Sequence, residues 1–157
     1  MVEIRKALME DAGVIREMIE EYKFRENGSG FLLPLNADAL LNAIENSDFF
    51  VACEDGKIAG CASVVEYDGI AELRSLAVKH DYMSMGIGSQ LIDRCIAESQ
   101  ERGYGELYAL TQTYRPFEKK GFVISETPPQ KMKNYCIKCP LKDNGCREFA
   151  VVYRMKE

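Results

Sequence analysis

Residues 79–105 of the chain, KHDYMSMGIGSQLIDRCIAESQERGYG, decide its fold together with ELYALT at 106–111. The apolar residues from Leu91 to Ile96 recur at helical spacing, and Gly103 follows a basic residue, so the pattern predicts a long helix that ends there. ELYALT predicts a strand directly after the helix. With the apolar strand that precedes this stretch, the two elements form a β-α-β crossover, which makes its two strands parallel.

Upstream of this crossover, the sequence predicts three strands joined by tight turns. FFVACE at 49–54 and KIAGCASVVEY at 57–67 are separated by Asp55-Gly56, which is a strong hairpin signal. Tyr67-Asp68-Gly69 marks a second turn before IAELRSLAV at 70–78. We expect these strands to form an antiparallel meander.

Further elements are expected toward both ends of the chain. VEI at 2–4 alternates like a strand, and EDAGVIREMIEEYKF at 10–24 has helical spacing. Asn36 is a candidate cap for a second helix. TYRPFEKKGF at 113–122 predicts a short helix ended by its glycine, and CREFAVVYRM at 146–155 predicts a last strand. The order of these strands and helices along the chain indicates an α/β (α+β) fold with a mixed, mostly antiparallel central sheet and flanking helices.

Length and composition favour one domain over residues 1–157. A mass of 17.7 kDa is near the modal size of a domain, and 46% hydrophobic with 29% charged residues excludes a disordered or fibrous chain. No apolar run reaches the roughly 18 residues of a membrane span. The N-terminus MVEIRKALMED is charged where a signal peptide is apolar, so we expect a cytoplasmic protein with no membrane partner.

The distribution of charge argues against a nucleic-acid partner. Residues 131–157 hold seven Lys or Arg against three Asp or Glu, a balance of +4, and the net charge of −5 leaves −9 for residues 1–130. Binding of nucleic acid needs a clustered basic surface, which an acidic body does not supply. A basic segment on an acidic body suits an anionic small molecule.

Residues 84–89, Ser-Met-Gly-Ile-Gly-Ser, lie between the expected strand and the long helix. Backbone N–H groups at a helix start have no intrahelical acceptor, and such ends bind anions. Gly86 and Gly88 lack a Cβ, so a phosphate can approach the backbone closely. A dinucleotide fingerprint needs glycine where Leu91 stands, and a P-loop needs Gly-Lys-Ser/Thr, so neither motif fits. The alternative is that both glycines serve only a tight turn.

This stretch resembles motif A of the GCN5-related N-acetyltransferase (GNAT) family, in which a Leu-Ala-Val strand and x-x-x-Gly-x-Gly-Ser precede a helix that holds the pyrophosphate of acetyl-coenzyme A. IRKALMEDAGVI at 4–15 is similar to the family's first strand and helix, FFVACEDGKIAGCASV at 49–64 to its central hairpin, and FEKKGF at 117–122 to its late F-Y-E-K-x-G-F motif. The resemblance covers nearly the whole chain. It implies the GNAT fold and acetyl-coenzyme A (acetyl-CoA) as co-substrate.

Within the family, the chain looks closest to the acetyltransferase domain of N-acetylglutamate synthases, in a short form that lacks the kinase-like domain. DFFVACEDGKIAGCA at 48–62, IAELRSLAV, and LTQT followed by PFEKKGF carry this similarity. It implies transfer to the α-amino group of glutamate or a similar amino acid, in arginine biosynthesis. The alternatives are a different amine, such as a protein N-terminus, a polyamine or an aminoglycoside, or a non-catalytic module that binds coenzyme A (CoA).

The resemblance also implies which residues contact the coenzyme. The backbone N–H groups of residues 85–89 are expected to bind the pyrophosphate, and the main chain of the preceding strand the pantetheine. A bulky side chain at either glycine of the loop is expected to obstruct binding. The full set expected to bind the coenzyme is Leu76, Ala77, Val78, Met83, Ser84, Met85, Gly86, Ile87, Gly88, Ser89 and Phe117.

Three positions depart from the family pattern. Met83 stands where motif A usually begins with Arg or Gln, and Phe117 stands where the late motif has a tyrosine. Leu35 stands where the synthases often carry an arginine near the substrate. Because backbone N–H groups hold most of the pyrophosphate, the change at Met83 is expected to weaken binding without abolishing it.

Acetyl transfer needs a neutral amine, so a base must take a proton from the ammonium. Glu72 is the first candidate, because family resemblance places a carboxylate here beside the acceptor amine. Strand alternation is expected to put Glu72, Arg74 and Leu76 on one face. His80, the single histidine, has a suitable ordinary pKa and is the alternative base.

The departing thiolate and the tetrahedral oxyanion need hydrogen-bond donors. Tyr114, one helical turn before the Phe117 position, is a candidate acid, and Thr111 is another by similarity to the synthases. Water can also protonate a CoA thiolate. The family precedent for the oxyanion donor is a backbone N–H near Leu76. A carboxylate on the acceptor is expected to meet cations, for which the candidates are Arg74, Lys131 and Lys133.

The six cysteines fall into two groups. Cys53, Cys61 and Cys95 lie on apolar faces and are expected in the core. Cys136, Cys139 and Cys146 lie in the Cys-rich basic segment 131–147, at a spacing that can hold zinc but without an evident fourth ligand. We expect this cluster to function without an essential metal. The sequence also leaves a homodimer open.

Overall fold

The computed structural model describes residues 1–22, 36–133 and 149–156. Its elements in chain order are β1 (Val2–Lys6), η1 (Met9–Asp11), α1 (Ala12–Tyr22), α2 (Ala37–Glu45), β2 (Phe49–Glu54), β3 (Lys57–Tyr67), β4 (Ile70–Val78), η2 (His80–Tyr82), α3 (Ile87–Glu101), β5 (Glu106–Thr111), α4 (Arg115–Glu118), β6 (Val123–Ile124) and β7 (Phe149–Arg154). The longer elements confirm the predicted succession.

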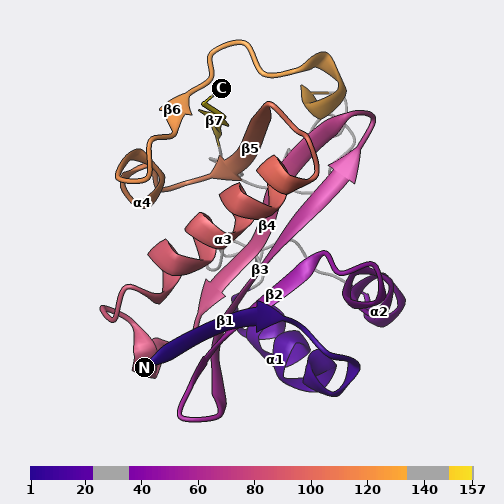
Figure 1. Ribbon diagram of the computed structural model, residues 1–157, viewed down its shortest axis with the longest axis vertical. Coiled ribbons are helices and arrows are strands. Elements are labelled where there is room, and N and C mark those ends of the chain that lie inside the picture. Colours follow the sequence, from indigo (N-terminus) through magenta and orange to yellow (C-terminus); the bar gives the residue numbers. More distant parts are fainter. Residues whose placement is uncertain (23–35, 134–148, 157) are drawn as a thin grey trace.

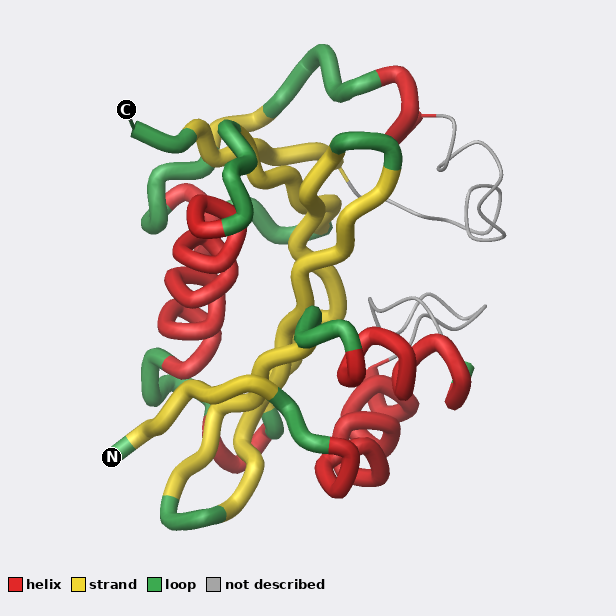
Figure 2. The backbone as a smooth tube through the Cα atoms, turned by 45° about the vertical axis from the view of Figure 1, so that its right-hand side comes forward, coloured by secondary structure: helices red, strands yellow, loops and turns green. Residues whose placement is uncertain are grey.

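The described strands form one sheet in the order β1-β2-β3-β4-β5-β7-β6. Every neighbouring pair is antiparallel except β4 and β5, which are parallel and joined through α3 as the predicted crossover. Helix α3 lies along one face of the sheet, and α1 and α2 cover the other face (Figures 1 and 2). The mixed, mostly antiparallel α/β architecture is therefore confirmed.

Two tight turns build the central meander. Asp55 and Gly56 have φ values of 51° and 76°, and Asp68 and Gly69 have 50° and 82°. Positive φ at both central residues is the geometry of a type I′ turn, whose twist matches that of the strands it joins. The Asp-Gly pairs therefore fix both hairpins of β2, β3 and β4, as predicted.

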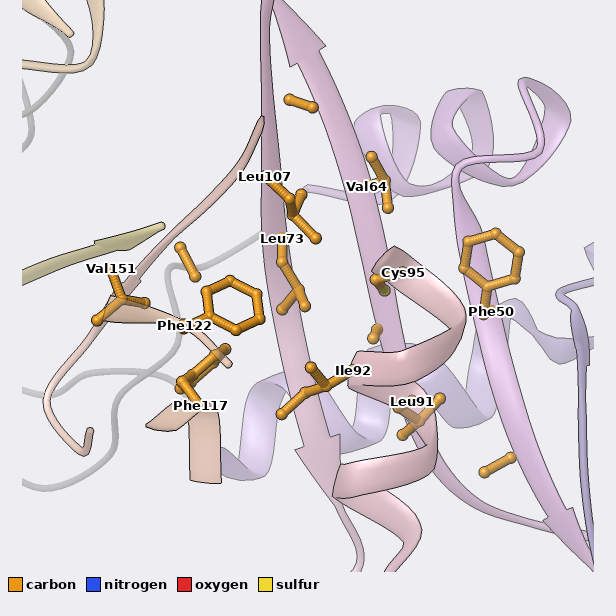
Figure 3. Close-up of a cluster of buried hydrophobic side chains, with 14 of the residues drawn as sticks. Phe50, Val64, Leu73, Leu91, Ile92, Cys95, Leu107, Phe117, Phe122 and Val151 are labelled. Atoms are coloured by element: carbon orange, nitrogen blue, oxygen red, sulfur yellow. The ribbon is translucent and has the colours of Figure 1, made fainter. Parts of the chain in front are cut away.

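The main core lies between α3 and the sheet (Figure 3). Leu91, Ile92 and Cys95 of α3 are fully buried there, and the rings of Phe117 and Phe122 meet edge to face with centroids 5.2 Å apart. A second cluster lies under α1 and α2 on the opposite face. Because both faces of the sheet are covered, β3 and β4 are apolar along most of their length.

Strand β4 contains a bulge that the sequence pattern did not predict. Ser63 pairs with Arg74 and Cys61 with Ala77, so β4 has one more residue than β3 between these pairs. Ser75 has φ 56° at this point. An extra residue inverts the alternation of every residue beyond it.

The bulge overturns the expectation that Leu76 shares a face with the residues that precede it. Leu76 packs against the core on the α3 side, and Ala77 belongs to the cluster under α1 and α2. Glu72 and Arg74 alternate with Leu73, which packs on the α3 side, so they lie on the opposite face from Leu76.

Smaller features complete the fold. Asn36 caps α2 as predicted, since its side chain accepts a hydrogen bond of 2.8 Å from the Ala39 N–H. Gly121, with φ 97°, ends the turn after α4. The two-residue strand β6 follows this turn. None of the described helices has the length and apolar character required to cross a lipid bilayer.

Candidate functional site

The start of α3 presents an array of backbone donors. Gly86 is the N-cap with φ 75°, and the first backbone hydrogen bond of the helix runs from the Gln90 N–H to the Gly86 oxygen at 3.1 Å. The N–H groups of residues 87–89 precede that bond and have no acceptor within the helix. Met83 and Met85 beside them are 47% and 48% exposed. Ile87 itself is 1% exposed, and Gly88 and Ser89 are half-buried. The array therefore begins beside exposed side chains and carries the positive end of the helix dipole.

The backbone conformation requires glycine at only one of the two glycine positions of this loop. The left-handed φ of Gly86 is strained for any residue with a Cβ, although no atom lies within 4 Å of the position that the Cβ would occupy. Gly88 has an ordinary φ, and a Cβ there would contact the Val78 side chain at 3.7 Å, a normal van der Waals distance. Only Gly86 is required by the backbone itself.

Among the residues that the structure describes, the last part of β4 has no strand partner on the side of β5. β4 pairs with β5 only through Glu72 and Leu73, whereas on the other side its pairing with β3 continues to Val78. The Lys79 N–H donates to the Ala59 oxygen of β3 at 2.7 Å. Because the N–H and C=O of one peptide point in opposite directions, the Val78 carbonyl faces away from β3.

A side chain of α1 reaches this edge of β4. The Tyr22 hydroxyl, at the end of α1, donates to the Val78 carbonyl at 2.9 Å. Sequence reasoning missed Tyr22, because the two residues are 56 positions apart and helical periodicity marks Tyr22 as an apolar position. The main-chain groups expected to bind pantetheine therefore lie where α1 meets β4.

Glu72 is a buried carboxylate held by an arginine. Its exposed fraction is 1%, and the Arg74 Nε donates to its Oε2. The Arg74 guanidinium also lies over the Tyr67 ring, 5.3 Å from its centroid. Burial raises the pKa of the Glu72 carboxyl, and the adjacent guanidinium acts in the opposite direction. The predicted base and the predicted substrate-binding arginine are thus in direct contact.

The other candidate catalytic residues make local contacts. The Tyr114 hydroxyl donates to the Phe122 carbonyl at 2.9 Å, and the Thr111 hydroxyl donates to the Thr113 carbonyl at 2.8 Å. Phe117, expected beside the coenzyme, is buried in the core. His80 is exposed at the start of η2. None of the hydrogen bonds described in the structure joins one of these residues to the Glu72 carboxylate.

The candidate acceptor-binding lysines lie toward the other end of β4. Lys131 donates to the backbone oxygen of Asp68, in the β3–β4 turn, at 2.8 Å, and Lys133 is exposed two residues further on. Leu35 and the cysteines at 136, 139 and 146 fall outside the described residues. In the part of the chain that the structure describes, no three His, Cys, Asp or Glu side chains lie together as a metal site requires.

The fold and the loop geometry agree with a family assignment. Residues 6–122 match the model of the acetyltransferase (GNAT) family, which is well over half of the chain. The chain belongs to the GNAT family and is an acetyltransferase.

Individual relatives cover the chain to different extents. A protein of Chlorobaculum tepidum named as an uncharacterized N-acetyltransferase is 34% identical over 95% of this chain and 94% of its own length. The amino-acid acetyltransferase of Shewanella oneidensis is 33% identical over 83% of this chain but only 29% of its own length. The N-acetylglutamate synthase of Neisseria gonorrhoeae, solved with CoA and N-acetyl-glutamate, superposes with a TM-score of 0.81 at 27% identity, over 100% of this chain and 36% of that chain.

Proposed function

We propose that this acetyltransferase moves the acetyl group of acetyl-CoA to the α-amino group of glutamate or a similar acidic amino acid. The observation that carries the proposal is the buried Glu72 carboxylate, held by Arg74 on the strand that leads to the donor array of α3. A buried, arginine-paired carboxylate at this position is suited to accept a proton from an ammonium group.

Similarity to two relatives supports an amino acid as acceptor. The Shewanella protein is named for amino-acid acetylation, and the Neisseria structure contains N-acetyl-glutamate. This chain spans about a third of either relative, so the acceptor and a role in amino-acid biosynthesis in the cytoplasm belong to the proposal.

The coenzyme is proposed to bind along β4 and the start of α3. The N–H groups of residues 85–89 would hold its pyrophosphate, because they lie at the positive end of a 15-residue helix. The main chain of Leu76 and Val78 would contact the pantetheine, since β4 has no β5 partner beyond Leu73. Because the Met83 side chain has no charge, the backbone N–H groups would bind the pyrophosphate without help from a cation at that position.

In the proposed reaction, Glu72 takes one proton from the acceptor ammonium, directly or through one water. The amine nitrogen then bonds to the thioester carbon, and the Leu76 N–H stabilises the resulting oxyanion. Collapse of the intermediate breaks the carbon–sulfur bond and releases the CoA thiolate. The nitrogen gives its second surplus proton to solvent, and the thiolate takes one proton from solvent. Arg74, Lys131 and Lys133 are the proposed cations for the acceptor carboxylates.

A panel of amines tests the acceptor class. Release of free CoA thiol would be measured with L-glutamate, L-aspartate, glutamate dimethyl ester, spermidine, an aminoglycoside and a short peptide. We expect kcat/KM to be highest for L-glutamate or L-aspartate. The dimethyl ester keeps the amine but has no carboxylate, so it should react at least tenfold less efficiently. Preferential turnover of spermidine or the peptide would refute an acidic acceptor while leaving the acetyltransferase assignment intact.

A further inference from the structure

Two side chains of β3 hold the bulge of β4. The Cys61 thiol donates to the Ser75 carbonyl with sulfur and oxygen 3.3 Å apart, and the Ser63 hydroxyl donates to the Arg74 carbonyl at 3.0 Å. Both carbonyls are therefore directed toward β3. Consecutive carbonyls of a regular strand point to opposite sides, so this arrangement exists only because Ser75 turns the chain at φ 56°.

The contact with Cys61 fixes the direction of the next backbone N–H. The Ser75 carbonyl and the Leu76 N–H belong to one planar trans peptide, in which the two groups point in opposite directions. Since Cys61 holds the carbonyl on the β3 side, the Leu76 N–H is directed away from β3. That side is the edge of β4 that has no β5 partner beyond Leu73.

We infer that Cys61 is a positioning residue, which orients the Leu76 N–H toward the thioester oxygen during acetyl transfer. The inference rests on the proposed function, because the N–H acts on the oxyanion that forms when the amine attacks. Cys61 itself forms no covalent bond and exchanges no proton with the substrates. Its effect is to keep a donor in place before the reaction begins, so that no reorganisation is needed as charge develops.

The chemistry of the Cys61 thiol suits this role. The side chain is fully buried, and burial raises its pKa to about 12, with a backbone hydrogen bond from Ala77 acting in the opposite direction. The thiol therefore keeps its proton at neutral pH and donates continuously to the Ser75 carbonyl. A serine hydroxyl can replace this donor, but an alanine methyl cannot.

Two matched alanine variants separate orientation from packing. Cys61→Ala removes the donor, and Cys95→Ala removes an equally buried thiol of α3 (Figure 3), which packs on the opposite face of the sheet from Cys61. The measurements are kcat and KM for acetyl-CoA and the Kd for free CoA. We expect Cys61→Ala to lower kcat about tenfold with KM and Kd changed less than twofold, because free CoA has no thioester oxygen. Cys95→Ala should keep the wild-type kcat.

A conservative variant completes the test. Cys61→Ser should restore kcat to within about twofold of the wild type, since its hydroxyl donates to the same carbonyl. If Cys61→Ala is too unstable to assay, Cys61→Val retains the core volume without a donor and should show the same loss. Wild-type kcat in the alanine or valine variant, or equal losses in the Cys61 and Cys95 variants, would overturn the inference. If the wild-type protein transferred no acetyl group to an acidic amino acid, that result would instead refute the proposed function.

Discussion

At the scale of single residues, the properties of Glu72 depend on Arg74. Burial alone would favour the protonated carboxyl, whereas a guanidinium on Oε2 favours the carboxylate. The net result is a pKa above the ordinary value of glutamic acid. A base with a raised pKa is better matched to the ammonium whose proton it takes, provided that the pH keeps it ionised.

Glu72→Gln is expected to lower kcat by about 10²–10⁴-fold, because the amide cannot accept the ammonium proton. The Kd of acetyl-CoA should be nearly unchanged. In the wild type, kcat/KM should fall as pH decreases through the raised pKa of Glu72. In the variant, this dependence should disappear, and the residual rate should rise with pH toward the pKa of the amine. Steady-state kinetics between pH 5.5 and about 9 measures both effects.

A control for this substitution lies on the neighbouring strand. Glu106 of β5 pairs with Arg154 at an exposed site, so Glu106→Gln makes the same chemical change in a carboxylate that is open to water. It should leave kcat and its pH profile unchanged. Wild-type turnover in Glu72→Gln at neutral pH would remove Glu72 from the mechanism and direct attention to His80.

At the scale of secondary-structure elements, the start of α3 depends on one backbone conformation. Gly86 adopts φ 75°, and the helix begins at the next residue. A β-carbon in the left-handed region costs about 1–2 kcal/mol, so a side chain at this position drives the backbone toward another conformation. Any such change redirects the N–H groups that follow.

Gly86→Ala and Gly88→Ala form a matched pair for this element. Gly86→Ala should destabilise the protein by about 1 kcal/mol and weaken acetyl-CoA binding at least tenfold, about 1.4 kcal/mol. Gly88→Ala should be tolerated, because its Cβ meets Val78 at a normal 3.7 Å and alanine favours a helix. Calorimetric titration and thermal unfolding measure the two effects. Equal affinity in both variants would show that the array does not bind the coenzyme.

At the scale of the whole molecule, Arg102 ties distant segments together. Its guanidinium contacts Asp48 at 3.1 Å, Glu66 at 2.8 Å and Glu98 at 3.0 Å, and it donates to the Ser47 oxygen at 3.1 Å. These groups come from the α2–β2 turn, β3 and α3. Burial raises the pKa of Asp48, against the opposing effect of Arg102. One cation therefore compensates three acidic groups, of which Asp48 and Glu98 are largely shielded from water and Glu66 is exposed.

Arg102→Met should destabilise the protein by roughly 3 kcal/mol at pH 7, because it leaves the shielded Asp48 carboxylate without its cation beside Glu66 and Glu98. An acid whose pKa is raised in the folded state adds stability at low pH, and that stability is lost as pH rises through its folded-state pKa. The deficit in Tm relative to the wild type should therefore shrink as pH falls from 7 through the raised pKa of Asp48, because Asp48 then takes up a proton.

Arg154→Met is the control for the Arg102 substitution, since Arg154 pairs with Glu106 at an exposed site. Its effect on the free energy of unfolding should stay below about 1 kcal/mol, the usual limit for surface pairs. A deficit in Arg102→Met that is the same at every pH would show that lost packing, rather than uncompensated charge, destabilises that variant.

Local signals in the sequence determined most of the fold. Periods of two and 3.6 marked the longer strands and helices, Asp-Gly pairs marked the hairpin turns, and Asn36 marked the start of α2. Each signal depends on residues that lie within a few positions of each other, so no knowledge of distant contacts is needed. The glycines of the α3 loop predicted an anion site, and their resemblance to motif A of the GNAT family implied the coenzyme as its ligand.

The tertiary structure decided the features that depend on pairing between distant residues. The β4 bulge arises from its register with β3, so alternation alone placed Leu76 on the wrong face. Tyr22 reaches Val78 across 56 residues, and Cys61 reaches Ser75 across 14. A one-residue change of register reverses which side chains share a face, and no local pattern records it. The direction of the donor at Leu76 is therefore a property of the folded sheet.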